Sequence, residues 1–470
     1  MRFTRLSNLI VSVGVGSVVS CVIVSCASTE DTADSAPAPE APDSGPPSEP
    51  DAAPAVDATD AATDETDAAR IHPDFDASRP PIACESDACA KSLTTAARFW
   101  DNSFPGAPWS AWVDATSFCA LLSDETVACW GSNSSAQLGR GEAFPWWGSA
   151  TPARVPGLTN IVQLEGTCAV DKEGSAWCWG FGAYRNLDMV PTPTLEHSPI
   201  RLDLPPVKKV VMGVNRADGP TGCAILEDGG VVCWGANING VVPATDIGRN
   251  SILPLQPVAL PPGRQARDIG VGVAALALLD DGSLVSWGDT PTLGRPTSLA
   301  PNPHPGDVAI TGIVNAFSVT KTEGCAAAWG AGYCWGAGTD LTITDPRTFY
   351  PRDNLERALP TPIVVPEPIR EVSTSGSRNQ GCAIGESGAV YCWGDNTYGQ
   401  VGDGTKTYAA KPVQVSGLPA KAVEVKAAGD TTCVLLVNGK IYCWGGDEYG
   451  QLGAGAFYKP SVLPQEVTLP

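Results

Sequence analysis

From about residue 112 to the C-terminus, the chain repeats one pattern of hydrophobic and polar positions seven times. Each copy has a short run of alternating residues, a tight turn, and a second alternating run that ends in Trp-Gly. Alternation with a period of two is typical of half-buried β-strands, so each copy predicts a β-hairpin. The Trp-Gly dipeptides begin at Trp130, Trp179, Trp234, Trp287, Trp335, Trp393 and Trp444. Their spacing of 48 to 58 residues suits one propeller blade per copy.

Six of the seven copies carry a cysteine near each end of the hairpin. The pairs are Cys119 and Cys129, Cys168 and Cys178, Cys223 and Cys233, Cys325 and Cys334, Cys382 and Cys392, and Cys433 and Cys443. The remaining copy has Leu276 and Ser286 in the two places, so both cysteines are missing together. Disulfide partners predict this, because an unpaired cysteine in an exported protein is a liability. The spacing does not resemble the C-x2–4-C pairs of zinc sites. We therefore expect six hairpin disulfides, and a small seventh bridge between Cys84 and Cys89.

The copy that starts at Cys223 shows how the two strands are paired. Folding it about Asp228 gives a three-residue turn that ends at Gly229 and places Cys223 opposite Cys233. Such turns favour a left-handed last residue, which glycine adopts without steric cost. Glycine also occupies this place at Gly174, Gly282, Gly388 and Gly439. Glu125 takes it in the first copy, where we expect strain. The fifth copy is one residue shorter and should turn near Trp329-Gly330.

Residues 1–26 predict an export signal. Two arginines precede an uncharged apolar stretch at residues 9–24, which is shorter than the about 20 residues that a membrane-spanning helix needs. The stretch ends in Val24-Ser25-Cys26, which resembles the lipobox of bacterial lipoproteins, a family in which this cysteine is acylated. Cys21 follows a similar sequence and is the alternative acylation site. A signal peptide that is cleaved without lipidation is the simpler alternative. The absence of Asp after Cys26 implies, by the same resemblance, an outer-membrane or cell-surface lipoprotein.

Residues 27–83 predict a disordered acidic linker. Fourteen acidic residues between positions 27 and 80 are accompanied by only Arg70 and Arg79, among many Ala, Pro, Ser and Thr. Such a segment cannot bury enough apolar surface to offset the entropy lost on ordering. We expect it to act as a solvated tether for a folded domain at residues 84–470.

Three copies share further sequence after Trp-Gly. Residues 129–141 read CWGSNSSAQLGRG, residues 392–404 read CWGDNTYGQVGDG, and residues 443–455 read CWGGDEYGQLGAG. This pattern closely resembles the repeats of the regulator of chromosome condensation family. The resemblance covers the chain from about residue 112 and implies an all-β, seven-bladed β-propeller with its repeat tryptophans packed between blades. We expect residues 462–469 to pair with the first repeat and so close the ring without an exposed edge.

Composition argues against several functional classes. The net charge is −21, and the part from Cys84 onward has 37 acidic against 26 basic residues, which disfavours nucleic-acid binding. Only three histidines are present, and paired cysteines offer no thiolate nucleophile. Asp395 and Asp403 suggest calcium weakly, because they coincide with the turn pattern of the repeat. No Gly-rich phosphate loop follows a strand and opens a helix. We predict a protein that is not an enzyme and has no cofactor.

Aromatic residues in the loops after the Trp-Gly strands are the candidate binding residues. The adjacent Trp146 and Trp147 are the strongest, and Tyr350, Tyr398, Tyr449 and Tyr458 occupy comparable loops, as do Tyr184, Tyr408 and Phe457. Exposed aromatic residues are common interface hot spots, although each could instead cover the edge of a blade. We predict an envelope-anchored monomer that binds a protein or peptide through one propeller face and touches the membrane only through its lipid. A glycan-binding or glycan-processing propeller and a purely structural envelope component are the alternatives.

Overall fold

A computed structural model describes residues 76–84, 88–98, 115–142, 147–215, 219–244, 251–336, 358–376 and 380–470. The chain divides into two units, residues 1–62 and 63–470, and all described residues belong to the second. The candidate acylation sites Cys26 and Cys21 therefore lie outside the described residues. Within the described ranges, no helix is long and apolar enough to cross a membrane.

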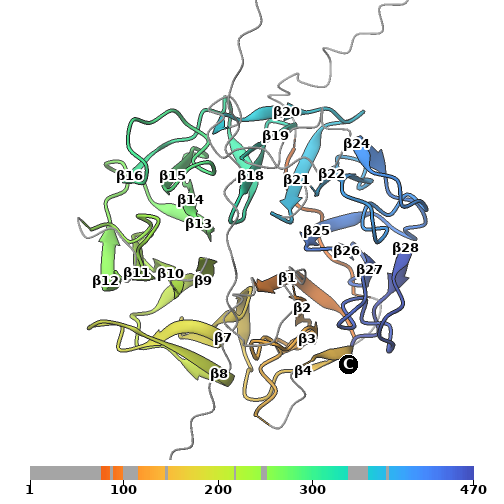
Figure 1. Cartoon of the computed structure of the whole chain (residues 1–470), viewed down its shortest axis with the longest axis horizontal. Coiled ribbons are helices and arrows are strands. Elements are labelled where there is room, and N and C mark those ends of the chain that lie inside the picture. The colour runs from red at the N-terminus through yellow and green to blue at the C-terminus, as the bar shows by residue number, and fades with distance from the viewer. Residues whose placement is uncertain are drawn as a thin grey trace, which may run out of the picture. The chain divides into compact units, whose positions relative to one another are not determined.

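The regular structure is a ring of seven antiparallel sheets, each made of four strands that follow one another in the chain (Figure 1). Each sheet is one blade, numbered along the sequence. Blades 1 to 4 comprise β1 (Ala90–Arg98), β2 (Ala115–Leu122), β3 (Val127–Gly131) and β4 (Ser149–Arg154); β5 (Ile161–Glu165), β6 (Cys168–Asp171), β7 (Ala176–Arg185) and β8 (Thr192–Arg201); β9 (Val207–Asn215), β10 (Gly219–Leu226), β11 (Val231–Ala236) and β12 (Ile252–Val258); and β13 (Ala266–Val271), β14 (Ala274–Leu279), β15 (Leu284–Gly288) and β16 (Asn302–Asp307).

Blades 5 to 7 comprise β17 (Val314–Val319), β18 (Glu323–Ala328), β19 (Ala331–Gly336) and β20 (Thr361–Ile363); β21 (Ile369–Thr374), β22 (Gly381–Gly385), β23 (Val390–Gly394) and β24 (Ala409–Gln414); and β25 (Ala422–Ala428), β26 (Thr431–Leu436), β27 (Ile441–Gly445) and β28 (Ser461–Glu466). The first strands, such as β1, β9 and β25, lie near the centre of the ring, and the fourth strands lie at its rim (Figure 1). The prediction of an all-β, seven-bladed propeller is confirmed.

The hairpins form with the expected register. Cys223 lies opposite Cys233, and Leu276 lies opposite Ser286 in the copy without cysteines. The structure contains the six hairpin disulfides and the Cys84–Cys89 bridge. The hairpin cysteines have Cα atoms 4.1–4.2 Å apart, close to the spacing of a non-hydrogen-bonded pair. The five turn glycines have φ between 77° and 86°, and Glu125 adopts φ 64° in the equivalent place, which is the expected strained conformation.

The repeat tryptophans are buried between neighbouring blades, as the resemblance implied. Most of their indole N–H groups donate to a backbone carbonyl in the preceding blade. The bonds of 2.7–2.9 Å run from Trp179 to Gln137, from Trp287 to Val241, from Trp335 to Thr292, from Trp444 to Gln400, and from Trp130 back to Gln451. The last bond joins blade 1 to blade 7, so the ring is closed by the same contact that joins the other blades.

The expected pairing of residues 462–469 with the first repeat is wrong. β28 is the outer strand of blade 7 and pairs with β27, while the inner strand of blade 1 is β1, which lies well before residue 112. The sequence hid this strand because Ala90–Arg98 consists mainly of small and polar residues around one buried leucine, Leu93, and carries no repeat signature. Among the described strands, none is exchanged between the first and last blades.

One backbone hydrogen bond recurs at all seven interfaces between blades. The amide that opens each inner strand donates to the carbonyl of the hairpin turn in the preceding blade. Six of these bonds run from Ile161 to Glu125, from Val207 to Gly174, from Ala266 to Gly229, from Val314 to Gly282, from Ile369 to Gly330, and from Ala422 to Gly388. The seventh runs from Ala90 to Gly439 at 2.9 Å and crosses the interface between blades 7 and 1, which we call the seam.

Candidate functional site

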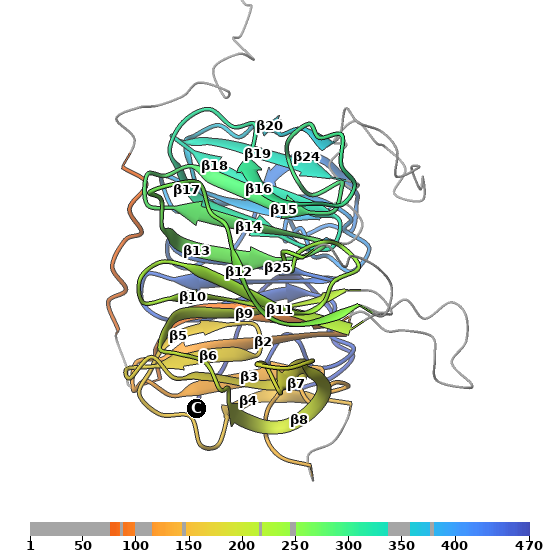
Figure 2. The ribbon, with the colours of Figure 1, turned by 90° about the vertical axis from the view of Figure 1, so that its left-hand side faces the viewer.

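The ring has two faces of different construction. Because consecutive strands are antiparallel, the hairpin turns and the connections between blades share one face, which we call the hairpin face. The connections from first to second and from third to fourth strands share the opposite face, which we call the loop face. Residues 76–84 run along one side of the ring in the edge-on view (Figure 2). The amide of Ala83 donates to Val437 O at 2.8 Å, beside the blade 7 turn, so the chain reaches the propeller on the hairpin face.

Apart from Tyr184, which is part of the third strand β7, the described aromatic candidates lie in connections from third to fourth strands, on the loop face. Trp147, Tyr398 and Tyr458 are 52%, 40% and 74% exposed, and Tyr449 is half-buried. Trp146 and Tyr350 lie outside the described residues. Tyr184, in contrast, is buried, and its hydroxyl donates to Trp179 O at 2.7 Å, so it belongs to the core.

The exposed aromatic residues gather on blades 6, 7 and 1, which are neighbours around the ring. The aromatic arc consists of Tyr398, Tyr449, Phe457, Tyr458 and Trp147. Its loops contact one another across the blade boundaries. Gly404 N donates to Val462 O at 3.2 Å, and Gly455 N donates to Ala150 O at 2.9 Å. The arc therefore crosses the seam, and it brings together residues about 250 to 310 positions apart in the sequence.

The sequence motif shared by these three blades is a scaffold for the arc. Gln400 Oε1 accepts the amide of Tyr398 at 2.9 Å, and Gln451 Oε1 accepts the amide of Tyr449 at 2.7 Å. The backbone carbonyl of Gln400 also accepts the indole N–H of Trp444 from the next blade. Each glutamine therefore fixes a tyrosine-bearing loop to the buried core. A partner would meet aromatic side chains on a backbone that is already ordered.

Tyr458 is held in a conformation that side chains rarely adopt. Its φ is 58°, in the left-handed region that disfavours residues with a Cβ atom. The surrounding loop imposes this backbone, because Tyr458 N donates to Asp447 O at 2.7 Å and Lys459 N donates to Asp447 Oδ2 at 3.2 Å. Local backbone strain of this kind at an exposed aromatic residue such as Tyr458 is typical of functional surfaces.

The neighbouring Tyr449 is uncharged. Burial and the nearby Glu448 raise the pKa of Tyr449 to about 12, so its phenol stays neutral.

The weak calcium hypothesis gains no support from the loop geometry. Asp395 Oδ1 accepts the amide and hydroxyl of Thr397, and Asp403 Oδ1 accepts the amide of Thr405 at 2.9 Å. Both carboxylates therefore stabilise turns within the same loop. Among the described residues, no group of three or more His, Cys, Asp or Glu side chains could hold a metal ion.

The centre of the ring contains a second candidate site that sequence analysis missed. A cavity of about 540 Å³ runs between the inner strands and is lined by charged side chains. Lys209 on β9 contacts Glu165 on β5 at 2.9 Å and Asp268 on β13 at 2.6 Å. In the sequence, charged residues at alternate positions of a strand are usually interpreted as facing solvent. In the ring, the inner strands surround the central axis, so the charged side chains of neighbouring blades contact one another.

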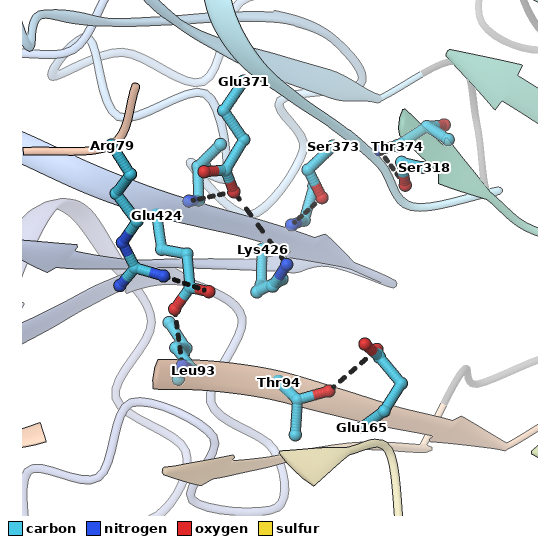
Figure 3. A network of polar contacts seen from close by, with 12 residues as sticks. Arg79, Leu93, Thr94, Glu165, Ser318, Glu371, Ser373, Thr374, Glu424 and Lys426 are labelled. Atoms are coloured by element: carbon cyan, nitrogen blue, oxygen red, sulfur yellow. Dashed lines mark hydrogen bonds and ion pairs between the residues drawn. The ribbon is translucent and has the colours of Figure 1, made fainter. Parts of the chain in front are cut away.

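These central charges mainly join one blade to the next (Figure 3). Glu371 Oε1 accepts the amide of Val425 at 3.2 Å and lies 3.9 Å from Lys426 Nζ, while burial raises the pKa of Glu371 to about 7. At the seam, Glu424 accepts the amide of Leu93 at 2.6 Å and pairs with Arg79 at 3.0 Å. Because these carboxylates already have partners within the protein, the aromatic arc is the stronger candidate for binding another molecule.

Comparison with known proteins identifies the repeats. The model of the regulator of chromosome condensation (RCC1) repeat matches residues 387–436 and 438–470, and a second model of the same description matches residues 372–400 and 423–451. The ultraviolet-B receptor UVR8 of Arabidopsis thaliana is 25% identical over 368 residues, which cover 72% of this chain and 76% of the receptor. The E3 ubiquitin-protein ligase HERC2 of Homo sapiens is 28% identical over 72% of this chain, but this chain spans only 7% of the ligase.

Solved structures agree on the fold. The crystal structure of yeast RCC1 (Prp20) bound to Kap60 superimposes with a TM-score of 0.57 at 19% identity, covering 73% of this chain and 83% of that one. Human WBSCR16 gives the same TM-score at 19% identity, covering 73% of this chain and 94% of that one. The RCC1 repeats matched within residues 372–470 therefore belong to a chain that folds as a seven-bladed β-propeller.

Proposed function

We propose that this protein is an exported, non-catalytic interaction module that binds a protein or peptide partner through the aromatic arc. The observation that carries the proposal is the clustering of exposed aromatic side chains from three adjacent blades on loops fixed to the core. Tyrosine and tryptophan supply large contact areas at a low entropic cost and are enriched among interface hot spots. Yeast RCC1 (Prp20), which shares this fold, was crystallised with the protein Kap60.

Export is supported by the disulfides. Seven bridges in one folded unit form and persist in oxidising compartments, and they are rare in the cytosol. Acylation at Cys26 would add an envelope anchor. The chain reaches the propeller on the hairpin face, so a tether of this kind would attach opposite the aromatic arc. That arrangement would leave the arc available to a partner.

The test is a capture experiment with the full chain, produced under oxidising conditions and immobilised. It would be exposed to solubilised envelope proteins and to secreted proteins. The variant Trp147→Ser/Tyr458→Ser removes two exposed rings of the arc. Leu299→Ser is the matched control, because Leu299 is 50% exposed in the third-to-fourth-strand loop of blade 4, across the ring. All three proteins must show the same thermal unfolding before they are compared.

A partner retained by the parent chain and by Leu299→Ser, but lost by the arc variant, is the expected result. A partner retained equally by all three proteins would move the binding surface away from the arc. If no protein is retained from either fraction, the proposed interaction role loses its support.

A further inference from the structure

The seam differs from the other six interfaces because the polypeptide does not continue across it. At the other interfaces, the outer strand of one blade runs directly into the inner strand of the next through described residues. At the seam, blade 7 ends with the C-terminus and blade 1 begins at Ala90. The described residues 76–84 and 88–90 make contacts at this interface, where the covalent connection is missing. We call these described residues the latch segment.

Cys89 takes the place of a connecting residue in the latch segment. In blade 2 the amide of Lys172 donates to Asn160 O at 3.0 Å, and Asn160 belongs to the connection from blade 1. The equivalent bond in blade 1 runs from Ser123 N to Cys89 O at 2.8 Å. The following residue, Ala90, bonds to Gly439 in blade 7. Cys89 and Ala90 therefore hold the two hairpin turns on either side of the seam together.

The disulfide links this position to a third contact with blade 7. Ala83, immediately before Cys84, donates its amide to Val437 O at 2.8 Å. The Cys84–Cys89 bridge ties the residue that follows Ala83 to the residue that precedes Ala90. Earlier in the segment, Arg79 pairs with Glu424, whose second oxygen accepts the amide of Leu93 in blade 1. The closed bridge therefore restricts the two residues that bond to blade 7, Ala83 and Ala90.

This bridge is also the accessible one. The twelve cysteines of the hairpin disulfides are at most 7% exposed, and Cys89 is 1% exposed. Cys84, in contrast, is exposed on the hairpin face. Thiol–disulfide exchange needs an attacking thiolate to reach one of the two sulfur atoms. Because Cys84 is exposed and the hairpin cysteines are buried, we expect a thiolate to attack at Cys84 in the folded ring before it attacks any hairpin disulfide.

We propose that Cys84–Cys89 is a thiol–disulfide exchange site for an external dithiol, and that exchange opens the latch segment at the seam. One thiolate of the dithiol attacks Cys84 Sγ, a mixed disulfide forms, and the Cys84–Cys89 bond breaks to release the Cys89 thiolate. The second thiol of the dithiol then attacks the mixed disulfide and releases Cys84. The dithiol is oxidised to a disulfide, both cysteines are reduced, and the two thiolates take up protons.

The first experiment treats the folded full chain with dithiothreitol as the dithiol. Samples taken over time are quenched with iodoacetamide, and labelled cysteines are identified by peptide mass spectrometry. We expect Cys84 and Cys89 to be labelled at least about tenfold sooner than any hairpin cysteine, because local access is faster than opening a blade. Simultaneous labelling of all pairs, or earlier labelling of a hairpin pair, would overturn the proposal.

The second experiment asks whether the bridge holds the seam. Amide hydrogen exchange is compared between the parent chain, Cys84→Ala/Cys89→Ala and the matched hairpin variant Cys168→Ala/Cys178→Ala. The latch variant should speed exchange at Ala90 and Ser123 at least about tenfold and leave the equivalent amides of Val207 and Lys172 unchanged. Unaltered exchange at Ala90 would show that the bridge does not control the seam. If the latch variant fails to fold, the parent chain with only this pair reduced and alkylated takes its place.

Discussion

The hairpin face and the loop face are made by the same seven repeats, yet only one of them is uniform. On the hairpin face, each turn has two or three residues, and each turn carbonyl accepts an amide from the next blade. On the loop face, the connection between third and fourth strands varies from residues 186–191 in blade 2 to residues 337–360 in blade 5. A turn that packs on its neighbour cannot change without disturbing the ring. A loop that projects into solvent can acquire length and aromatic residues.

Glycine substitutions on the two faces should show the largest difference. Gly439 and Gly455 have nearly the same φ, 77° and 78°. A Cβ atom at Gly439 would overlap Cys89 Sγ, whereas a Cβ atom at Gly455 would have no neighbour within 4 Å. We expect Gly439→Ala to lower the free energy of unfolding by about 4 kcal/mol and Gly455→Ala by about 1 kcal/mol, measured by denaturant titration. Equal losses would mean that packing between blades does not explain the uniform turns.

The next largest difference between the two faces should be the pH dependence of their contribution to stability. The contact that recurs at every interface on the hairpin face is a backbone hydrogen bond, whereas Glu323 at the loop-face end of β18 is a buried carboxyl that accepts the hydroxyl of Thr374 from the next blade. Burial raises the pKa of Glu323 to about 7. The folded chain therefore holds this proton more tightly than the unfolded chain, so the stability that it contributes at pH 4 is lost as the pH rises toward 7.

The variant Glu323→Gln removes this titration. Between pH 5 and pH 8, we expect the free energy of unfolding of the parent chain to fall relative to that of the variant by up to about 3 kcal/mol. Denaturant titrations of both proteins at pH 5, 6.5 and 8 measure the difference. Parallel pH profiles would show that Glu323 does not titrate in this range.

A smaller effect should follow from loosening one loop of the arc. Gln400→Ala removes the oxygen that accepts the amide of Tyr398, but it keeps the backbone carbonyl that accepts the indole of Trp444. We expect a loss of about 1 kcal/mol in the free energy of unfolding, with faster hydrogen exchange at Tyr398. Lys406→Ala, at an exposed position in the same third-to-fourth-strand loop, serves as the control for the exchange rate. If exchange at Tyr398 is unchanged in Gln400→Ala, the glutamine does not order the arc.

The smallest effect on stability should come from the most exposed ring. Tyr458→Gly removes the side chain and suits the left-handed backbone at φ 58°, so we expect stability to change by less than about 1 kcal/mol. Partner capture should nevertheless fall. Thermal unfolding and the capture assay measure the two properties on the same protein. A large loss of stability would place Tyr458 among the structural residues.

The short-range parts of the fold could be predicted from the sequence. Cysteine spacing and turn glycines determine which residues face each other within a hairpin, because both act over about ten residues. The strand β1 could not be found in this way, since its small and polar residues become a strand only by packing between β2 and blade 7. Ring closure was therefore predicted with the wrong strand.

The candidate site was predicted one residue at a time. Loop position and aromatic character identified Trp147, Tyr398, Tyr449 and Tyr458, but their assembly into one arc depends on blades 6, 7 and 1 meeting around the ring. The prediction that Tyr184 is an exposed loop residue is wrong. Tyr184 is buried because β7 and β8 are longer than the repeat pattern predicts, and it lies near the end of β7. The charges around the central cavity were missed for a similar reason, because their partners lie on other blades.

Contiguous blades also affect how the chain can fold as it is synthesised. Every sheet is complete once its own four strands have emerged, and no sheet waits for a strand from the opposite end. Every disulfide joins a cysteine to the next one along the described chain, only 5 to 10 residues away. Cysteines oxidised in order of appearance would thus form the native pairs without later rearrangement. Each blade can therefore fold and form its disulfide while the rest of the chain is still being synthesised, and adding a repeat of the same kind would not create a new choice of cysteine partners.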